Sequence, residues 1–212
     1  RQMDWLRNHG YRFVSVDDVI ANRAGKRDLP DKAVLVTFDD AYQSMYVHAW
    51  PVLKMFRIPA VVSVVGSWLE QRDTIDVDGK LRPRSVMLSW EAIKEMSASG
   101  LVEIGSHSWD LHRGLVANPQ GNTQPAATAR RYLPEKKRYE DEGAYRARIE
   151  ADLAKSTAEV TRRTGKPPWV IAWPYWCFNA TTMSIAEKLC YTVVLTLEDV
   201  ANWPETPLLA LR

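Results

Sequence analysis

Hydrophobic and polar positions along the chain fall into blocks of two kinds, which predict alternating strands and helices. Short, nearly continuous apolar runs are typical of buried strands, and they occur at residues 33–38, 60–65, 101–105, 169–173 and 192–197. Segments with apolar residues at helical spacing lie around them, at residues 3–9, 44–56, 89–99, 142–163 and 182–189. Pro51 should split the second of these helices. The alternation predicts an α/β fold with parallel strands, as an open sheet or a barrel.

Two polar stretches interrupt this alternation. Residues 71–84 contain Asp78-Gly79 and Pro83, which predict a loop. Residues 118–140 hold several prolines and glycines and a charged run, and we expect a long insertion there. Insertions of this length in a compact domain are usually functional or mobile, and a plain solvated loop is the alternative.

Length and charge narrow the class of protein. The 212 residues suit a single domain spanning residues 1–212. The formal charge is only +2, with 28 basic and 26 acidic residues interleaved, so we expect no nucleic acid among the partners. No apolar run approaches the ~20 residues that a membrane-spanning helix needs.

Acidic and imidazole side chains follow two of the predicted strands. Asp39 and Asp40 come at the end of the first apolar run, and His107 and His112 follow the third. Since active sites of such folds lie at the carboxyl ends of the strands, we expect these side chains to converge. Two imidazoles and one carboxylate suit Zn²⁺ or a similar divalent ion and leave a position open for water. The second carboxylate is then free to act as general base.

Each of these motifs has a structural alternative. The carboxylates of a strand that ends in Asp-Asp often cap a helix or form a turn. A second acidic pair, Asp17-Asp18, precedes an apolar segment without any histidine cluster, and we interpret it as helix capping. Two histidines five residues apart are a weak signal in a helix, because they do not share a face as residues four apart do. The combination and its place after two strands favour the metal site.

Three motifs together resemble the polysaccharide deacetylase family, also called the NodB homology domain or carbohydrate esterase family 4. Residues 37–42 read TFDDAY and match the first family motif, TFDDG followed by an aromatic residue. His107 and His112 match the second motif, in the longer-spaced form of the deacetylases of poly-β-1,6-N-acetylglucosamine. Residues 173–175 read WPY and are similar to the third motif of that subgroup. The resemblance covers nearly the whole chain and implies a distorted (β/α) barrel.

The resemblance also implies a role for each motif residue. Asp39 is expected to be the general base, and the backbone N–H of Tyr42 to stabilise the oxyanion. The expected metal ligands are Asp40, His107 and His112. The expected substrate-binding residues are Trp173, Pro174, Tyr175 and Trp176. The metal is expected to be Zn²⁺, with Ni²⁺, Co²⁺ or Fe²⁺ as alternatives, and the reaction to remove acetyl groups from N-acetylglucosamine units of a biofilm exopolysaccharide.

Two substitutions and one absence depart from the family pattern. Ala41 and Trp176 occupy positions where glycine is usual. If position 41 needs a positive φ, alanine costs about 1 kcal/mol or more there. Members of the subgroup also use, as general acid, a histidine that lies ahead of the first residue of this sequence. We therefore expect the chain as given to bind metal well and to react slowly.

The resemblance carries expectations about context as well. Relatives act on exported polymer in the periplasm, some as outer-membrane lipoproteins, and continue into a C-terminal glycoside-hydrolase-like domain. We therefore expect residues 1–212 to be a fragment that lacks an N-terminal segment and that domain. Two other functions stay open: a deacetylase of chitin oligomers or peptidoglycan, and a catalytically weak sugar-binding module.

Overall fold

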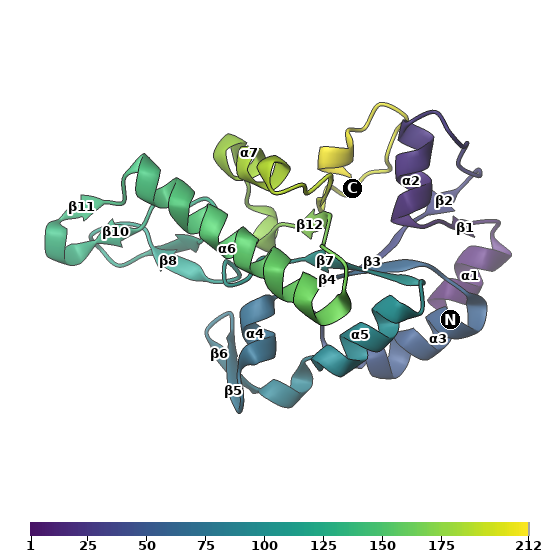
Figure 1. The fold of residues 1–212 in the computed structure, drawn as a ribbon, viewed down its shortest axis with the longest axis horizontal. Coiled ribbons are helices and arrows are strands. Elements are labelled where there is room, and N and C mark those ends of the chain that lie inside the picture. The colour runs from purple at the N-terminus through teal and green to yellow at the C-terminus, as the bar shows by residue number, and fades with distance from the viewer. Residues whose placement is uncertain (212) are drawn as a thin grey trace.

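The computed structural model describes residues 1–211 and is built around one parallel sheet (Figure 1). Its five strands lie in the order β13 (Val193–Leu195), β12 (Val170–Ala172), β7 (Val102–Ser106), β4 (Ala60–Val64) and β3 (Val36–Phe38). Every pairing between them is parallel. β4 is buried along its whole length, as expected for an inner strand that is covered on both faces. The apolar runs of the sequence therefore predicted the strands of this sheet.

The sheet continues beyond β3 and curls toward a barrel. The predicted strand at residues 33–38 is interrupted at Leu35, and its first part, β2 (Ala33–Val34), pairs in parallel with β1 (Arg12–Phe13). At the opposite edge, Leu195 pairs with Leu211. Residues of β4, β12 and β13 pack with residues next to β1 in one buried cluster, which fills the inside of the curl. The result is an open, distorted (β/α) barrel, which confirms the predicted fold class.

Seven α-helices occur within the described residues. They are α1 (Gln2–Asn8), α2 (Val16–Arg23), α3 (Trp50–Phe56), α4 (Gly66–Glu70), α5 (Trp90–Ala98), α6 (Glu142–Thr164) and α7 (Ala180–Lys188). The side chains of Ser89, Asp141 and Asn179 accept backbone N–H groups at the starts of α5, α6 and α7, as N-cap residues do. Pro51 lies at the start of α3, after a π-helical segment (Met45–Ala49), so it divides the predicted helix as expected.

The acidic pair near the N-terminus lies in the first turn of α2, so the helix begins earlier than predicted and only Asp18 takes part in its capping. Ser15 is the N-cap of α2, and its hydroxyl accepts the N–H of Asp18 at 3.1 Å. The Asp18 carboxylate in turn accepts the N–H of Ser15 at 3.0 Å, which completes a capping box. This pair is therefore accounted for by local structure.

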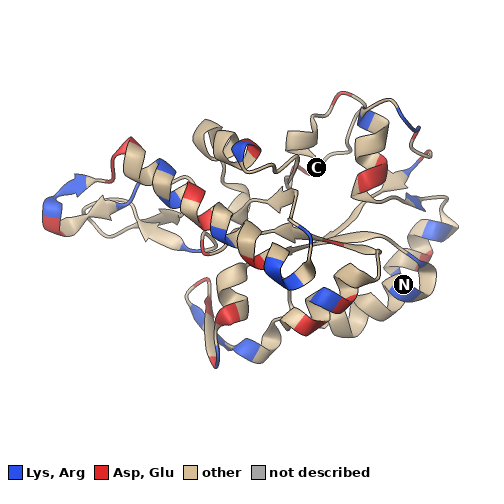
Figure 2. Cartoon of the chain, in the orientation of Figure 1, with Lys and Arg blue, Asp and Glu red and all other residues tan. Residues whose placement is uncertain are grey.

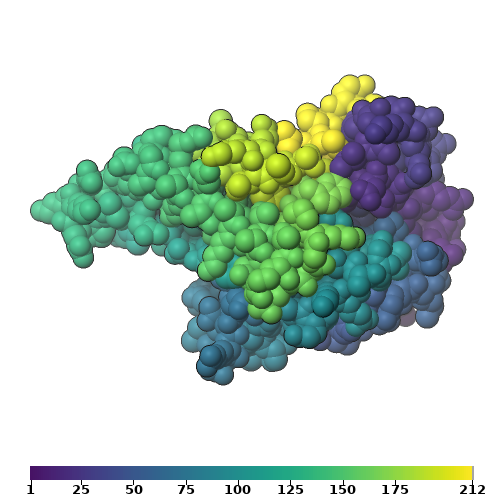
Figure 3. All heavy atoms as spheres, in the orientation of Figure 1, coloured from purple at the N-terminus to yellow at the C-terminus, as the bar shows by residue number. Residues whose placement is uncertain are grey.

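Two stretches that the sequence predicts as loops contain ordered hairpins. β5 (Thr74–Val77) pairs with β6 (Lys80–Pro83) around a turn at Asp78-Gly79. Later, β8 (Gly114–Val116) pairs with β9 (Thr123–Pro125), and β10 (Tyr132–Leu133) pairs with β11 (Arg138–Tyr139). We call residues 114–140 the arm, because they project from the sheet beside the first part of α6 (Figure 1, Figure 3). The loop predicted at residues 71–84 is therefore wrong, and the insertion expected at residues 118–140 contains short strands, because strands of two to four residues are too short to show a periodic pattern.

Short 3₁₀ segments occur at Arg84–Val86, Pro134–Lys136, Pro174–Trp176 and Leu208–Ala210. Basic and acidic residues are mixed over the elements shown in Figure 2, in line with the small formal charge. Within residues 1–211, no helix combines the length and apolar character needed to cross a membrane.

Candidate metal centre and active site

The carboxyl ends of β3 and β7, the two strands that flank β4 in the sheet, bring the predicted metal ligands together. Asp40 follows β3, and the segment after β7 carries His107 and His112. The Oδ1 atom of Asp40 lies 3.5 Å from Nε2 of His107 and 3.4 Å from Nε2 of His112. One potential ligand atom from each residue lies within 4.8 Å of the other two. The structure therefore places the three side chains around one point.

His107 is held in the orientation that a metal ligand needs. Its ring is buried, and its Nδ1 atom lies 2.6 Å from the carbonyl oxygen of Ala172 at the end of β12. An N–H at Nδ1 donates this hydrogen bond, which leaves the lone pair of Nε2 facing Asp40. Burial lowers the pKa of His107 to about 4, and the charge of Asp40 opposes this shift. The ring is therefore neutral near pH 7 and binds a cation without first losing a proton.

His112 is positioned by ring packing. Its ring contacts Trp68 and Tyr175, with ring centroids 4.7 Å and 4.5 Å away. Its Nδ1 atom is buried and has no hydrogen-bond partner in the described part of the chain. The Asp78 carboxylate lies 3.9 Å from that nitrogen and accepts the hydroxyl of Tyr175 at 2.6 Å. A carboxylate thus lies near His112 in the place where metal-binding histidines commonly have an acceptor.

The backbone between the two histidines is fixed by side-chain acceptors. Asp152 of α6 accepts two backbone N–H groups, those of residues 109 and 110, at 2.8 Å each. The hydroxyls of Ser106 and Ser108 accept the N–H groups of residues 108 and 111 at 3.0 Å each. Burial raises the pKa of Asp152 to about 6 in spite of its two donors. These bonds hold the loop in place before any ligand arrives.

The turn after β3 has a strained backbone. Asp40 and Ala41 have positive φ values of 70° and 65°, a conformation that costs a residue with a Cβ roughly 1–2 kcal/mol. Ala41 is fully buried, and its carbonyl accepts the N–H of Leu88 at 2.8 Å. Tyr42 follows and forms an isolated antiparallel bridge with Met87. The condition under which alanine is unfavourable at position 41 is therefore met.

Asp39 is a carboxylate with a free lone pair. Its Oδ1 atom is buried and accepts no hydrogen bond from residues 1–211. Burial raises the pKa of Asp39, and this shift is opposed by the Ser63 hydroxyl and by the charge of His112. The Ser63 hydroxyl lies beside Asp39, although no hydrogen bond of ordinary geometry joins the two. A partner-free carboxylate with a raised pKa, next to a set of metal-binding side chains, suits a general base.

The third motif divides into buried and accessible residues. Trp173 is fully buried in the hydrophobic cluster that includes residues of α6 and α7, and Pro174 is buried as well. Neither presents a face to a sugar, which corrects the expectation that both bind substrate directly. Tyr175 lines the cleft beside His112, whereas Trp176 is 49% exposed and lies outside that lining. The φ values of Tyr175 and Trp176 are 55° and 52°, so Trp176 also adopts a conformation that favours glycine.

A cleft of about 880 Å³ opens beside His112, between the β5–β6 and β8–β9 hairpins. Its volume lies within the usual range for small-molecule sites. Trp68 and Asp78 line it, and neither was a predicted site residue. Trp68 comes soon after the end of β4, and this position after a strand was the signal in the sequence that could have identified it as a site residue. Asp78 lay in a segment that the sequence predicted as a loop.

The donor set fits a divalent cation. Two neutral imidazoles and one carboxylate are a common set for Zn²⁺ and related ions, and three protein ligands leave a position for water. The Oδ1 atom of Asp40 is buried without a hydrogen-bond partner in residues 1–211, which a cation would correct. Burial raises the pKa of Asp40, and the two histidines oppose the shift. The residues therefore form a site for a divalent metal whose identity they do not select.

The chain belongs to the polysaccharide deacetylase family, because the sequence model of that family matches residues 26–194. It is 37% identical over 200 residues to the poly-β-1,6-N-acetyl-D-glucosamine N-deacetylase of Escherichia coli K12. That alignment covers 93% of this chain and 30% of the relative, so the chain spans about a third of that protein. The enzyme of the same name from Staphylococcus aureus is 26% identical over 97% of this chain and 61% of its own length.

Solved structures support the same family. The BpsB deacetylase domain from Bordetella bronchiseptica superposes with a TM-score of 0.96 at 41% identity, over 100% of this chain and 81% of that chain. A de-N-acetylase from Aggregatibacter actinomycetemcomitans gives a TM-score of 0.89 at 37% identity, over 96% of this chain and 78% of its own. The predicted family and fold are thus confirmed.

Proposed function

We propose that the chain is a metal-dependent N-deacetylase that acts on N-acetylglucosamine units of a β-1,6-linked polymer. The observation that carries the proposal is the buried Oδ1 atom of Asp39, which has no hydrogen-bond partner within residues 1–211, beside the triad of Asp40, His107 and His112. A donor triad alone would also suit a structural metal, whereas a free base beside it suits hydrolysis. The name of the Escherichia coli relative supports the choice of polymer.

The side chains divide the chemistry among themselves. A divalent ion held by the triad would polarise the acetamide carbonyl and lower the pKa of a water. Asp39 accepts a proton from the attacking water at its free Oδ1 atom. The N–H of Tyr42 donates no hydrogen bond within residues 1–211, so it is available to stabilise negative charge on the carbonyl oxygen. The C–N bond then breaks, acetate leaves, and the sugar amine takes up a proton.

The context of the reaction is part of the proposal. We expect Zn²⁺ as the metal, with Ni²⁺, Co²⁺ or Fe²⁺ able to replace it, because all of them accept this donor set. The expected compartment is the periplasm, which rests on the family resemblance. Fractionation of cells that produce the whole protein would test the compartment, and metal analysis of the purified protein would test the ion.

The decisive experiment measures acetate release from a β-1,6-linked N-acetylglucosamine oligomer. Metal-free protein and protein with added Zn²⁺, Ni²⁺ or Co²⁺ are compared with Asp39→Asn. We expect metal-dependent release, and a loss of about 10²- to 10⁴-fold in Asp39→Asn, with metal affinity retained in a calorimetric titration. His107→Ala should lose both activity and metal affinity, which separates the base from the ligands.

Other outcomes point to other functions. Release from chitin oligomers or peptidoglycan but not from the β-1,6 oligomer would show a different substrate. Tight metal binding without acetate release from any of them would contradict the deacetylase and favour a sugar-binding module. The strained, non-glycine residues Ala41 and Trp176 are the features that such a module would explain.

A further inference from the structure

A second hollow lies along the arm and borders the cleft at the metal centre through two shared lining residues. It measures about 470 Å³, and Arg113 and Gly114 line both spaces. The rest of its lining comes from β8 and from the segment at Arg131, Tyr132 and Pro134. Figure 1 shows β8 running from the region of the sheet toward β10. A polymer bound at the metal centre therefore has a path along the arm.

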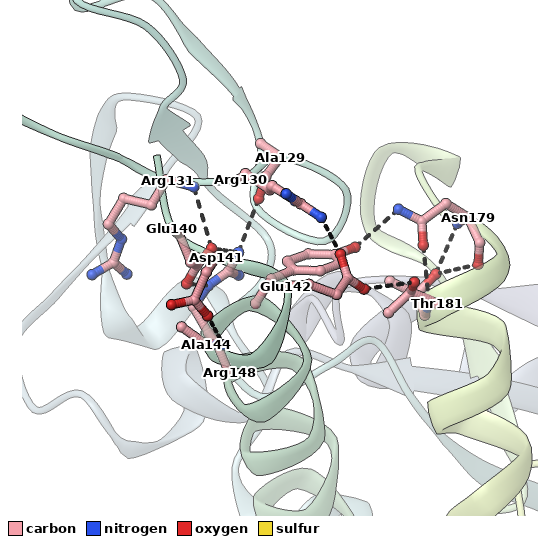
Figure 4. Close-up of polar contacts among 12 residues, drawn as sticks. Ala129, Arg130, Arg131, Glu140, Asp141, Glu142, Ala144, Arg148, Asn179 and Thr181 are labelled. Atoms are coloured by element: carbon pink, nitrogen blue, oxygen red, sulfur yellow. Dashed lines mark hydrogen bonds and ion pairs between the residues drawn. The ribbon is translucent and has the colours of Figure 1, made fainter. Parts of the chain in front are cut away.

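The arm is braced so that this hollow is already formed. Arg148 of α6 donates to the Glu140 carboxylate at 2.9 Å and 3.0 Å and to the carbonyls of Ala126 and Ala129 (Figure 4). The Glu140 carboxylate also accepts the N–H of Arg131, which itself lines the hollow. The side chains of Glu140 and Arg148 are only 9% and 16% exposed. Such a buried, bidentate pair ties the two ends of the outer hairpin to α6.

A second set of bonds ties the base of the arm to α7. The hydroxyl of Tyr145 donates to the carbonyl of Ala127 at 2.7 Å and accepts from the Asn179 side chain at 2.9 Å. In Figure 4, Asn179 lies on the opposite side of α6 from Glu140. Because the arm is ordered in the free protein, a ligand would not have to order it on binding.

The lining of the hollow suits an uncharged sugar. The ring of Tyr132 is half-buried and packs edge-on against Tyr139, with centroids 5.3 Å apart. Aromatic rings of this kind present an apolar face with a polar edge. The lining includes Arg131 and Arg113, which pairs with Asp110 outside the lining, and it includes no carboxylate, so it offers no ionic partner to the ammonium group of a deacetylated unit. An N-acetylated unit carries no such charge.

We propose that the arm hollow binds N-acetylated units of the same polymer chain, away from the unit at the metal centre, with Tyr132 as the stacking residue. This inference rests on the proposed function, because the occupant is the polymer whose acetyl group is removed. It makes the arm a determinant of preference for long substrates. Short oligomers occupy the metal centre without reaching Tyr132.

The test compares β-1,6-linked N-acetylglucosamine oligomers of two lengths, a dimer and a hexamer. Tyr132→Ala should lower kcat/KM for the hexamer relative to the dimer by about 2- to 10-fold, the range expected for one aromatic contact. Tyr132→Phe keeps the ring and should keep the ratio. Tyr139→Ala is the matched control, since Tyr139 belongs to the same ring pair but does not line the hollow.

The outcomes separate this inference from the proposed function. An unchanged ratio in Tyr132→Ala, or an equal drop in Tyr139→Ala, would overturn the role of the hollow while leaving the deacetylase intact. If the wild-type protein releases no acetate, the proposed function fails. Calorimetric binding of both oligomers to metal-loaded Asp39→Asn, with and without Tyr132→Ala, then still decides whether the hollow binds the longer chain.

Discussion

The two segments that supply the metal ligands are stabilised in opposite ways. The loop from Ser106 to His112 is held by hydrogen bonds, two of them to the carboxylate of Asp152. The turn from Asp39 to Tyr42 has positive φ values at Asp40 and Ala41, and both of its carboxylates have a buried oxygen without a partner in residues 1–211. The loop has its backbone N–H groups satisfied by side-chain acceptors, whereas the turn leaves two carboxylate oxygens unsatisfied.

This difference indicates how the site divides its tasks. The histidines need a fixed geometry, so their loop is built like a structural element. The carboxylates need free lone pairs for a cation and for a proton, so their turn stores strain and unpaired oxygens that the surrounding fold must tolerate. A cation would therefore stabilise the turn more than the loop, because it satisfies Asp40 directly.

The largest effect should come from a substitution that crowds the loop from Ser106 to His112. The backbone N–H of Gly66 donates to the Ser108 carbonyl at 3.2 Å, and a Cβ on Gly66 would overlap the indole of Trp109. Gly66→Ala should therefore push Trp109 away, destabilise the fold by about 1–3 kcal/mol and weaken metal binding at least about tenfold. Urea unfolding and calorimetric metal titration measure the two effects.

A matched glycine serves as the control for this change. A Cβ on Gly143, in the first turn of α6, would meet only the Asp141 carboxylate at 3.4 Å. Gly143→Ala should raise stability by up to about 1 kcal/mol, because alanine favours helix, and leave metal affinity unchanged. Equal metal affinity in Gly66→Ala and Gly143→Ala would show that the loop does not depend on close packing against α4.

A second effect, of at most similar size, should follow from the carboxylate that holds the same loop. Because burial raises the pKa of Asp152 to about 6 from an ordinary value near 3.8, the folded state binds its proton more tightly than the unfolded state. Its contribution to the free energy of unfolding should therefore fall as pH rises from about 4 to 6 and then stay constant. The fall amounts to about 3 kcal/mol at most.

Asp152→Asn removes this titration and isolates it. The difference in unfolding free energy between wild type and Asp152→Asn, measured in urea at pH 4 and pH 7, should shift against the wild type at the higher pH. The amide also presents a donor to one of the two backbone N–H groups, which adds a cost that does not vary with pH. A difference that is constant across this range would contradict the raised pKa.

The convergence of Asp40, His107 and His112 could be predicted from sequence because it follows from strand order. These residues lie in the segments that follow β3 and β7 of one parallel sheet, and such strands end at a common edge. Side chains that contact residues far away in the sequence gave no comparable signal. Asp152 lies inside α6, 43 residues from the N–H of Trp109, and Asp78 lies 97 residues from the hydroxyl of Tyr175.

The third motif shows another limit of pattern reading. Matching residues identified Trp173 as part of the site, but the pattern does not say which side of a strand end faces the cleft. In the structure the Trp173 ring packs into the core and the Tyr175 ring lines the cleft. Short hairpins such as β5–β6 are not predicted from the sequence for a related reason. Their pairing depends on the turn and not on a hydrophobic period.

The strained turn itself should give the smallest effect, since opposing terms act at Ala41. Ala41→Gly removes a φ penalty of about 1–2 kcal/mol. It also deletes a fully buried methyl group, worth about 0.8 kcal/mol, and adds backbone freedom to the unfolded chain, worth about 0.5–1 kcal/mol. These terms nearly cancel, so urea unfolding should show a change of less than about 1 kcal/mol.

Valine at the same position makes this prediction testable in the opposite direction. Ala41→Val places a β-branched side chain at a φ of 65° in a site with no exposed surface, and it should cost about 2 kcal/mol or more. If Ala41→Val unfolds at the same urea concentration as Ala41→Gly, the turn relaxes easily and its strain is not fixed by the fold. If only Ala41→Val loses stability and metal affinity together, the turn is held rigidly, and the carboxylates depend on that rigidity as the histidines depend on Asp152.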